Sequence, residues 1–314
     1  MHQTKSLIFK TTASSNHWID LAKELSKLNR QSFSQGRMYE VSSIEVHAPA
    51  NLQDGDSVEA SVSALQCTWV TRNAFVKAKK AWQRMNRLVL KDSPSVKPKY
   101  HDFKVYFDRD YDGTSIGCVD ALGNALPSGD WSYSRFVMPS NTVDPANGFP
   151  TDALENYISM NGNPIPATPT FHGTINAIQA YASARATVDD DSPNVDSAFH
   201  NNFYSQLTDM SSHEDDIANN LENRGDSPPY NVDSYIGDPN SMGSARTLIG
   251  KRTLNPHHPD IRFGSFCAPC GHIGITINRN IQSDNSGNPL EAVWIRVNLK
   301  SGKYKGVLAP SMEA

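Results

Sequence analysis

An alternating strand that runs directly into a long helix, in residues 57–91, constrains the fold most strongly. Apolar and polar residues alternate from Val58 to Ala64, as in a strand with one buried face. The alternation then shifts phase between Leu65 and Trp69, which predicts a β-bulge. Because no glycine or proline separates this strand from the helix, the helix is expected to pack on a sheet.

The helix predicted over residues 70–91 is amphipathic and basic, and Thr71 is its expected N-terminal cap. Five apolar residues recur at helical spacing: Phe75, Ala78, Trp82, Met85 and Val89. The opposite face has six cations: Arg72, Lys77, Lys79, Lys80, Arg84 and Arg87. Such a face can bind nucleic-acid phosphates or lipid head groups, or it can be an ordinary solvated helix surface.

Composition narrows the class of protein. The chain has 314 residues and a net charge of -4, so one large or two modest domains are expected. Neither end has the run of Lys and Arg that condenses a genome, which argues against a general nucleic-acid coat. No apolar stretch predicts a secretion signal or a membrane span. Four cysteines and no Asn-x-Ser/Thr site predict folding in a reducing cytoplasm without a disulfide framework.

Periodicity predicts many short strands and few helices. Strands are expected at 5–11, 38–48, 57–69, 103–108, 114–121, 131–138, 244–254, 261–268, 272–280, 290–299 and 303–309. Besides the basic helix, helices are expected at 17–30, 175–187 and 203–222. Since strands and helices do not alternate regularly, a doubly wound sheet or a TIM barrel is disfavoured.

Six prolines between Pro139 and Pro169 predict a linker and a domain boundary. Residues 1–140 would form one domain, with an N-terminal helix and the basic helix. Residues 141–314 would form the other, with a helical and acidic insertion around residues 175–225. The predicted fold is mainly β: two antiparallel jelly-roll β-sandwiches in one chain, with inserted helices.

One segment resembles a metal site, with the residues His257, His258, Cys267, Cys270 and His272. Cys267, Cys270 and His272 are candidate zinc ligands, because thiolates and imidazoles suit a tetrahedral ion. However, a second ligand pair is missing, and an Ala-Pro corner between two strands would separate the thiols. We therefore expect buried strand cysteines, with zinc or a redox pair as alternatives.

Other motifs for catalysis or cofactor binding are missing. The sequence has no Gly-x-Ser-x-Gly elbow and no phosphate-binding glycine loop, so neither an enzyme nor a cofactor is expected. Two acidic runs, 189–191 and 214–216, can bind calcium weakly or remain solvated. The tripeptide at 224–226, Arg-Gly-Asp, matches an integrin-binding motif, but it also fits a turn that closes a helix.

Aromatic residues of a predicted strand, Trp131, Tyr133 and Phe136, can stack on sugars or bases. In an alternating strand such residues more often belong to the core or to a sheet face. Both interpretations stay open from the sequence.

Three segments together, Trp69 to Arg87, Gly129 to Val137 and Phe266 to Ile277, resemble major capsid proteins of small tailless icosahedral viruses, especially bacterial viruses. The resemblance implies a double jelly roll that forms homotrimers in a virion shell. It also implies other virion proteins, such as a pentameric vertex protein, and in many relatives an internal lipid membrane. The basic helix would then face the shell interior or a neighbouring subunit.

The missing basic N-terminal arm departs from the single-jelly-roll capsid proteins of small circular DNA viruses, and it favours the double jelly roll. Two other classes stay open. One is a carbohydrate- or receptor-binding β-sandwich, supported by the aromatic residues and the Arg-Gly-Asp tripeptide. The other is a zinc enzyme on a cupin-like barrel, supported by the His and Cys cluster.

Overall fold

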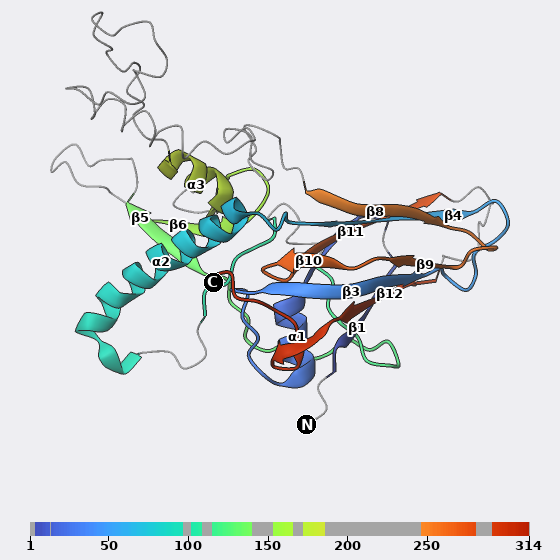
Figure 1. Cartoon of the computed structure of the whole chain (residues 1–314), viewed down its shortest axis with the longest axis horizontal. Coiled ribbons are helices and arrows are strands. Elements are labelled where there is room, and N and C mark those ends of the chain that lie inside the picture. Colours follow the sequence, from blue (N-terminus) through green and yellow to red (C-terminus); the bar gives the residue numbers. More distant parts are fainter. Residues whose placement is uncertain are drawn as a thin grey trace, which may run out of the picture.

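Two facing antiparallel sheets form the body of the protein. A computed structural model describes residues 4–12, 14–96, 102–108, 115–139, 153–165, 172–185, 246–280 and 291–313. The first sheet contains β1 (Ser6–Thr11), β12 (Val293–Leu299), β3 (Met38–His47), β10 (Phe266–Pro269) and β9 (Asp260–Phe263). The second contains β2 (Asn16–Asp20), β11 (His272–Asn280), β4 (Ser57–Ala64) and β8 (Thr247–Leu254). Figure 1 shows the two sheets as layers, with the helices α2 and α3 at one end.

The strands pair as a nested hairpin. β1 pairs with β12, β2 with β11, β3 with β9 and β10, and β4 with β8, all antiparallel. The first four strands of the chain therefore meet the last ones in reverse order. The mainly β, antiparallel prediction is confirmed. The predicted division at residue 140 does not follow the sheets, because strands from both sides of it pair with each other.

Buried apolar residues alternate with outward-facing residues on these strands, and the buried ones form one core between the sheets. On β12, Val293, Ile295 and Val297 are fully buried, while Arg296 points outward and is exposed. The buried residues of β11, Ile273, Ile275 and Ile277, belong to the same cluster. Burying one such side chain contributes roughly 1.5–3 kcal/mol, so the matched alternation on several strands favours this pairing.

Residues between β4 and β8 form a long insertion. It contains α2 (Trp69–Asp92), the 3-10 turn η1 (Pro94–Val96), β5 (Arg135–Pro139), β6 (Ala153–Ser159), β7 (Gly173–Asn176) and α3 (Ala177–Arg185). β5, β6 and β7 make a third sheet, in which β6 and β7 run parallel. A second apolar cluster, with Phe75, Phe103 and Ile158, joins this insertion to Trp18 of β2. The proline-rich linker predicted from residue 139 thus contains a strand.

Several predicted elements differ at their ends. The helix expected at 17–30 is wrong in its first part: β2 occupies Asn16–Asp20, and α1 spans Leu21–Asn29. Asp20 caps α1 by accepting a hydrogen bond from the backbone N–H of Lys23 at 3.1 Å. The apolar spacing around Trp18 fits a helix as well as a strand, and pairing with β11 decides for the strand.

The start of α2 also differs from the prediction. β4 ends at Ala64, so the phase shift after it marks the end of the strand rather than a bulge. The cap is Thr68 rather than Thr71, since the Thr68 hydroxyl accepts the N–H of Thr71 at 3.2 Å.

Further predicted strands are shorter or differ from the expected ranges. Residues 103–108 and 115–121 form only isolated bridges, at Tyr106, Ser115 and Val119. The last predicted strand, 303–309, is replaced by β13 (Ser301–Tyr304). The helix predicted at 203–222, both acidic runs and the Arg-Gly-Asp tripeptide lie outside the described residues. None of the described helices has both the length and the apolar character needed to cross a membrane.

Candidate interaction surface

The basic helix α2 is anchored at its N-terminal end. The indole of Trp69 packs edge-on against Tyr181 of α3, with ring centroids 6.3 Å apart. The amide of Asn73 donates to the hydroxyl of Tyr181 at 3.2 Å. Phe75 is fully buried against Phe103, at 5.3 Å between ring centroids. These contacts fix the first half of α2 on the insertion.

The second half of α2 extends away from the sheets (Figure 1). The helix has 24 residues, which corresponds to a length of about 36 Å. Trp82 is buried against Phe103 and Met85 is half-buried, while the side chain of Val89 is not among the described ones. The predicted apolar stripe is therefore confirmed as far as Met85.

The six predicted cations of α2 fall into two groups. Near its first half, the ammonium of Lys79 lies 2.8 Å from the carboxylate of Glu313, and that of Lys77 lies 5.8 Å from the ring centre of Tyr181. Arg72 is half-buried there. From the middle of the helix onward, Lys80, Arg84 and Arg87 are exposed. Among the described residues, no carboxylate lies within ion-pair distance of these three, which we call the distal cations.

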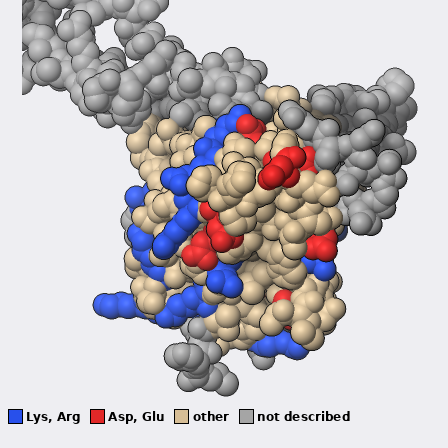
Figure 2. Space-filling view, turned by 90° about the vertical axis from the view of Figure 1, so that its right-hand side faces the viewer, with Lys and Arg blue, Asp and Glu red and all other residues tan. Residues whose placement is uncertain are grey.

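Some cations on the sheets are paired with carboxylates, whereas the distal cations are not. The ammonium of Lys251 lies 2.8 Å from Glu59 on the neighbouring strand, and the guanidinium of Arg296 lies 3.7 Å from Glu45. Figure 2, which views the end of the sandwich away from the helices, shows a band of Lys and Arg with acidic residues beside it. The unpaired positive charge of the distal cations makes α2 a candidate for binding an anion or an acidic surface.

The alternative of a zinc site at Cys267, Cys270 and His272 does not hold. Cys267 is in a disulfide with Cys67, at a Cα–Cα distance of 6.6 Å, and is not free to bind a metal. Cys270 sits in the turn between β10 and β11 and is fully buried, with its sulfur 3.6 Å from that of Met312. This turn separates the two thiols, as expected from the Ala-Pro corner. Among the described residues, no group of three or more His, Cys, Asp or Glu side chains can hold a metal ion.

The disulfide itself corrects the expectation that Cys267 is a buried thiol. Cys67 lies in the segment that joins β4 to α2, and Cys267 lies on β10 of the opposite sheet. The bond therefore ties the base of the basic helix to the sandwich. A separation of 200 residues hides this pair from any reading of local spacing.

A buried polar cluster of Asp20, Gln35 and His272 was not predicted. The amide nitrogen of Gln35 donates to the carboxylate of Asp20 at 2.7 Å and lies 3.2 Å from Nε2 of His272. The amide oxygen of Gln35 accepts the N–H of Val105 at 2.6 Å. Burial raises the pKa of Asp20 to about 7 and lowers the pKa of His272 to about 3.

Because these side chains are at most 1 % exposed, the cluster stabilises the junction of β2, β11 and residues 102–108 rather than forming an open catalytic site. No local motif signals it, since its members are far apart in sequence.

The aromatic residues that were candidates for stacking on sugars or bases are packed against other side chains rather than exposed. Tyr133 stacks on Tyr106, with ring centroids 3.9 Å apart, and Trp131 lies under the ammonium of Lys104 at 4.8 Å. Phe136 is half-buried against the second apolar cluster. The structure therefore favours the core interpretation of these residues over an exposed sugar-stacking platform.

Comparisons with protein-family models, with curated proteins and with solved structures found no match to this chain. The resemblance to capsid proteins stays a prediction, which rests on sequence pattern and on the arrangement described above.

Proposed function

We propose that the protein is a structural capsid subunit that assembles, as homotrimers, into an icosahedral virus shell. The observation that carries the proposal is the strand order of the two sheets, β1-β12-β3-β10 facing β2-β11-β4-β8. Four nested antiparallel pairs wrapped into two facing sheets fit a jelly roll, an architecture that viral capsid proteins share with lectins and cupins. Since that fold has several functions, further features must support the choice.

The proposed shell wall is one jelly roll, not two. Strands before residue 65 and after residue 246 pair with each other, so the insertion between β4 and β8 is added to a single sandwich. This revises the double jelly roll that the missing basic arm favoured. In the third sheet β5 and β6 pair antiparallel but β6 and β7 run parallel, so the sheet is not antiparallel throughout, as a second jelly roll would be.

Large apolar side chains are exposed at four described positions: Leu122, Val137, Leu248 and Leu308. In a closed shell, each subunit needs lateral contacts that are complementary under the shell symmetry. These residues are candidates for such contacts. We propose that the distal cations of α2 contact a neighbouring subunit or face the interior of the shell. There an acidic patch, a lipid head group or a nucleic-acid phosphate would neutralise their charge.

The first experiment is a measurement of mass in solution by light scattering, followed by negative-stain imaging of the largest species. Trimers, closed shells or hexagonal patches would support the proposal. A stable monomer or dimer that never assembles would overturn it. Glycan binding without a lattice would instead favour the carbohydrate- or receptor-binding β-sandwich.

A second experiment tests the distal cations. Lys80→Glu, Arg84→Glu and Arg87→Glu are combined in one variant, and Arg252→Glu, Arg262→Glu and Lys303→Glu form a control with the same charge change at other exposed positions. We expect the first variant to lose assembly, or association with anionic vesicles or nucleic acid, more strongly than the control. Equal behaviour of the two variants would remove α2 from the proposed interface.

A further inference from the structure

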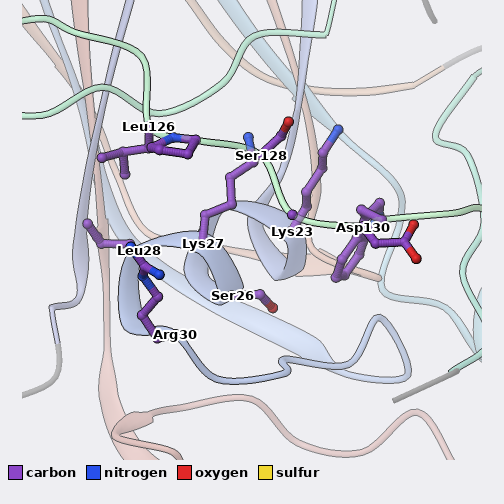
Figure 3. A pocket seen from close by; sticks show the side chains of 11 residues that line it. Lys23, Ser26, Lys27, Leu28, Arg30, Leu126, Ser128 and Asp130 are labelled. Carbon is purple, nitrogen blue, oxygen red and sulfur yellow. The ribbon is translucent and has the colours of Figure 1, made fainter. Parts of the chain in front are cut away.

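A pocket of about 390 Å³ lies between α1 and residues 126–131 (Figure 3). Its volume falls in the range of roughly 300–1,000 Å³ that is typical of small-molecule sites. One wall is the face of α1 with Lys23 and Lys27, continued by Arg30 just after the helix. The other wall is the segment that ends at Asp130 and Trp131.

The charged residues of the lining are mainly cationic. Lys23, Lys27 and Arg30 face a single lining carboxylate, that of Asp130. The ammonium of Lys27 donates to both carboxylate oxygens of the buried Glu24, at 2.9 and 3.1 Å, which holds it in place and leaves one N–H donor for another partner. Among the described residues, neither Lys23 nor Arg30 has a carboxylate within ion-pair distance. The lining therefore has more positive than negative charge.

The lysines are positioned to act together. Lys23 and Lys27 are four residues apart on α1, so they lie on the same helix face. In Figure 3 both side chains point toward the segment with Ser128, while Arg30 lies at the other end of the pocket. Two ammonium groups aimed at the same side suit one oxyanion with several acceptor oxygens.

An aromatic wall lies beside these cations. Trp131 lines the pocket and is half-buried against the core. The ammonium of Lys104, which is 8 % exposed, sits 4.8 Å from its ring centre and adds a further positive charge behind the wall. Cations next to an aromatic side chain are the combination that proteins use to hold a phosphate and stack a base.

We infer that this pocket binds a nucleoside phosphate, with Lys23 and Lys27 at the phosphate and Trp131 beside the base. The inference does not depend on the proposed capsid function, because it rests only on the lining of the pocket.

The test is calorimetric titration of the whole chain with thymidine monophosphate, inorganic phosphate and thymidine at low ionic strength. We expect saturable binding of thymidine monophosphate that is at least about tenfold weaker in Lys23→Gln, because a charge-assisted hydrogen bond is lost. Lys303→Gln, an exposed lysine outside the pocket, is the control and should bind like the unchanged chain. Lys27 is left unchanged, since its removal would unpair the buried Glu24.

Three results would overturn the inference. The first is no saturable binding of thymidine monophosphate to the unchanged chain. The second is equal affinity of Lys23→Gln and Lys303→Gln for it. The third is binding of inorganic phosphate as tight as that of the nucleotide, which would leave no role for Trp131.

Discussion

Replacing Asp20 by asparagine should change how the stability of the fold depends on pH. Burial raises the pKa of Asp20 from 3.8 in a solvated chain to about 7 in the fold. The folded state therefore binds the proton more tightly than the unfolded state does. For this reason, the stability linked to this group is fully present below pH 3.8 and is lost as the pH rises through about 7.

The size of the effect follows from the shift. One pKa unit corresponds to about 1.4 kcal/mol, so the full range amounts to about 4 kcal/mol, and the interval from pH 5 to pH 7 to about 2 kcal/mol. His272 acts in the opposite direction. Its pKa falls from 6.5 to about 3, so its contribution rises with pH over the same interval, by about 2 kcal/mol. In the unchanged chain these two contributions nearly cancel.

Asp20→Asn removes the contribution of Asp20, which falls as the pH rises, and leaves that of His272, which rises. Asparagine also caps helices well, so the start of α1 should be kept. We expect the free energy of unfolding of the variant to rise between pH 5 and pH 7 by about 2 kcal/mol more than that of the unchanged chain. Any cost of the altered hydrogen bond to Gln35 is the same at both pH values and cancels in this comparison.

The assay is urea unfolding followed by tryptophan fluorescence, since Trp18 lies 5.6 Å from His272 between ring centroids and reports on this region. Asp54→Asn, at a carboxylate that is 84 % exposed, is the matched control and should keep the pH dependence of the unchanged chain. The reasoning is refuted if Asp20→Asn and Asp54→Asn show the same pH dependence.

Two further predictions concern the disulfide and the core. Reduction, or the double variant Cys67→Ser with Cys267→Ser, should lower the free energy of unfolding by about 2–5 kcal/mol, because the bond closes a loop of 200 residues. Thermal unfolding with and without reductant measures this, and a double variant that still responds to reductant would contradict it. Ile275→Ala, at a fully buried position of β11, should cost about 2–5 kcal/mol in urea unfolding. Asn278→Ala, at an exposed position of the same strand, should cost at most about 1 kcal/mol, and equal costs would contradict the assignment of the buried face.

The local sequence pattern was enough to predict a strand or helix where one face of that element is buried. The alternation of Val293, Ile295 and Val297 predicted β12, and the apolar spacing after Trp69 predicted α2 to within a residue at each end. In both cases the period of the apolar residues reports directly which side faces the core. The basic face of α2 was predicted in the same way, but its division into paired and distal cations depends on Glu313 and Tyr181, which no local pattern reveals.

The local sequence pattern was ambiguous where the spacing of the apolar residues fits both a helix and a strand. Trp18 suited a helix, yet it is buried in β2, whose partner β11 is more than 250 residues away in sequence. Phe103, Val105 and Phe107 alternate like a strand, but they pack as an extended segment with only an isolated bridge at Tyr106. In such segments the choice depends on which neighbour supplies the missing hydrogen bonds.

The sequence by itself determined the antiparallel, strand-rich class, the positions of most strands and the basic helix, because these follow from periodicity over a few residues. Only the tertiary structure decided that the two ends of the chain form one sandwich. It also decided that the proline-rich region belongs to an insertion, and that Cys67 meets Cys267 and Asp20 meets His272. Each of these joins residues about 200 or more apart in sequence, and such pairs are selected by the burial of matching faces, which no local pattern encodes.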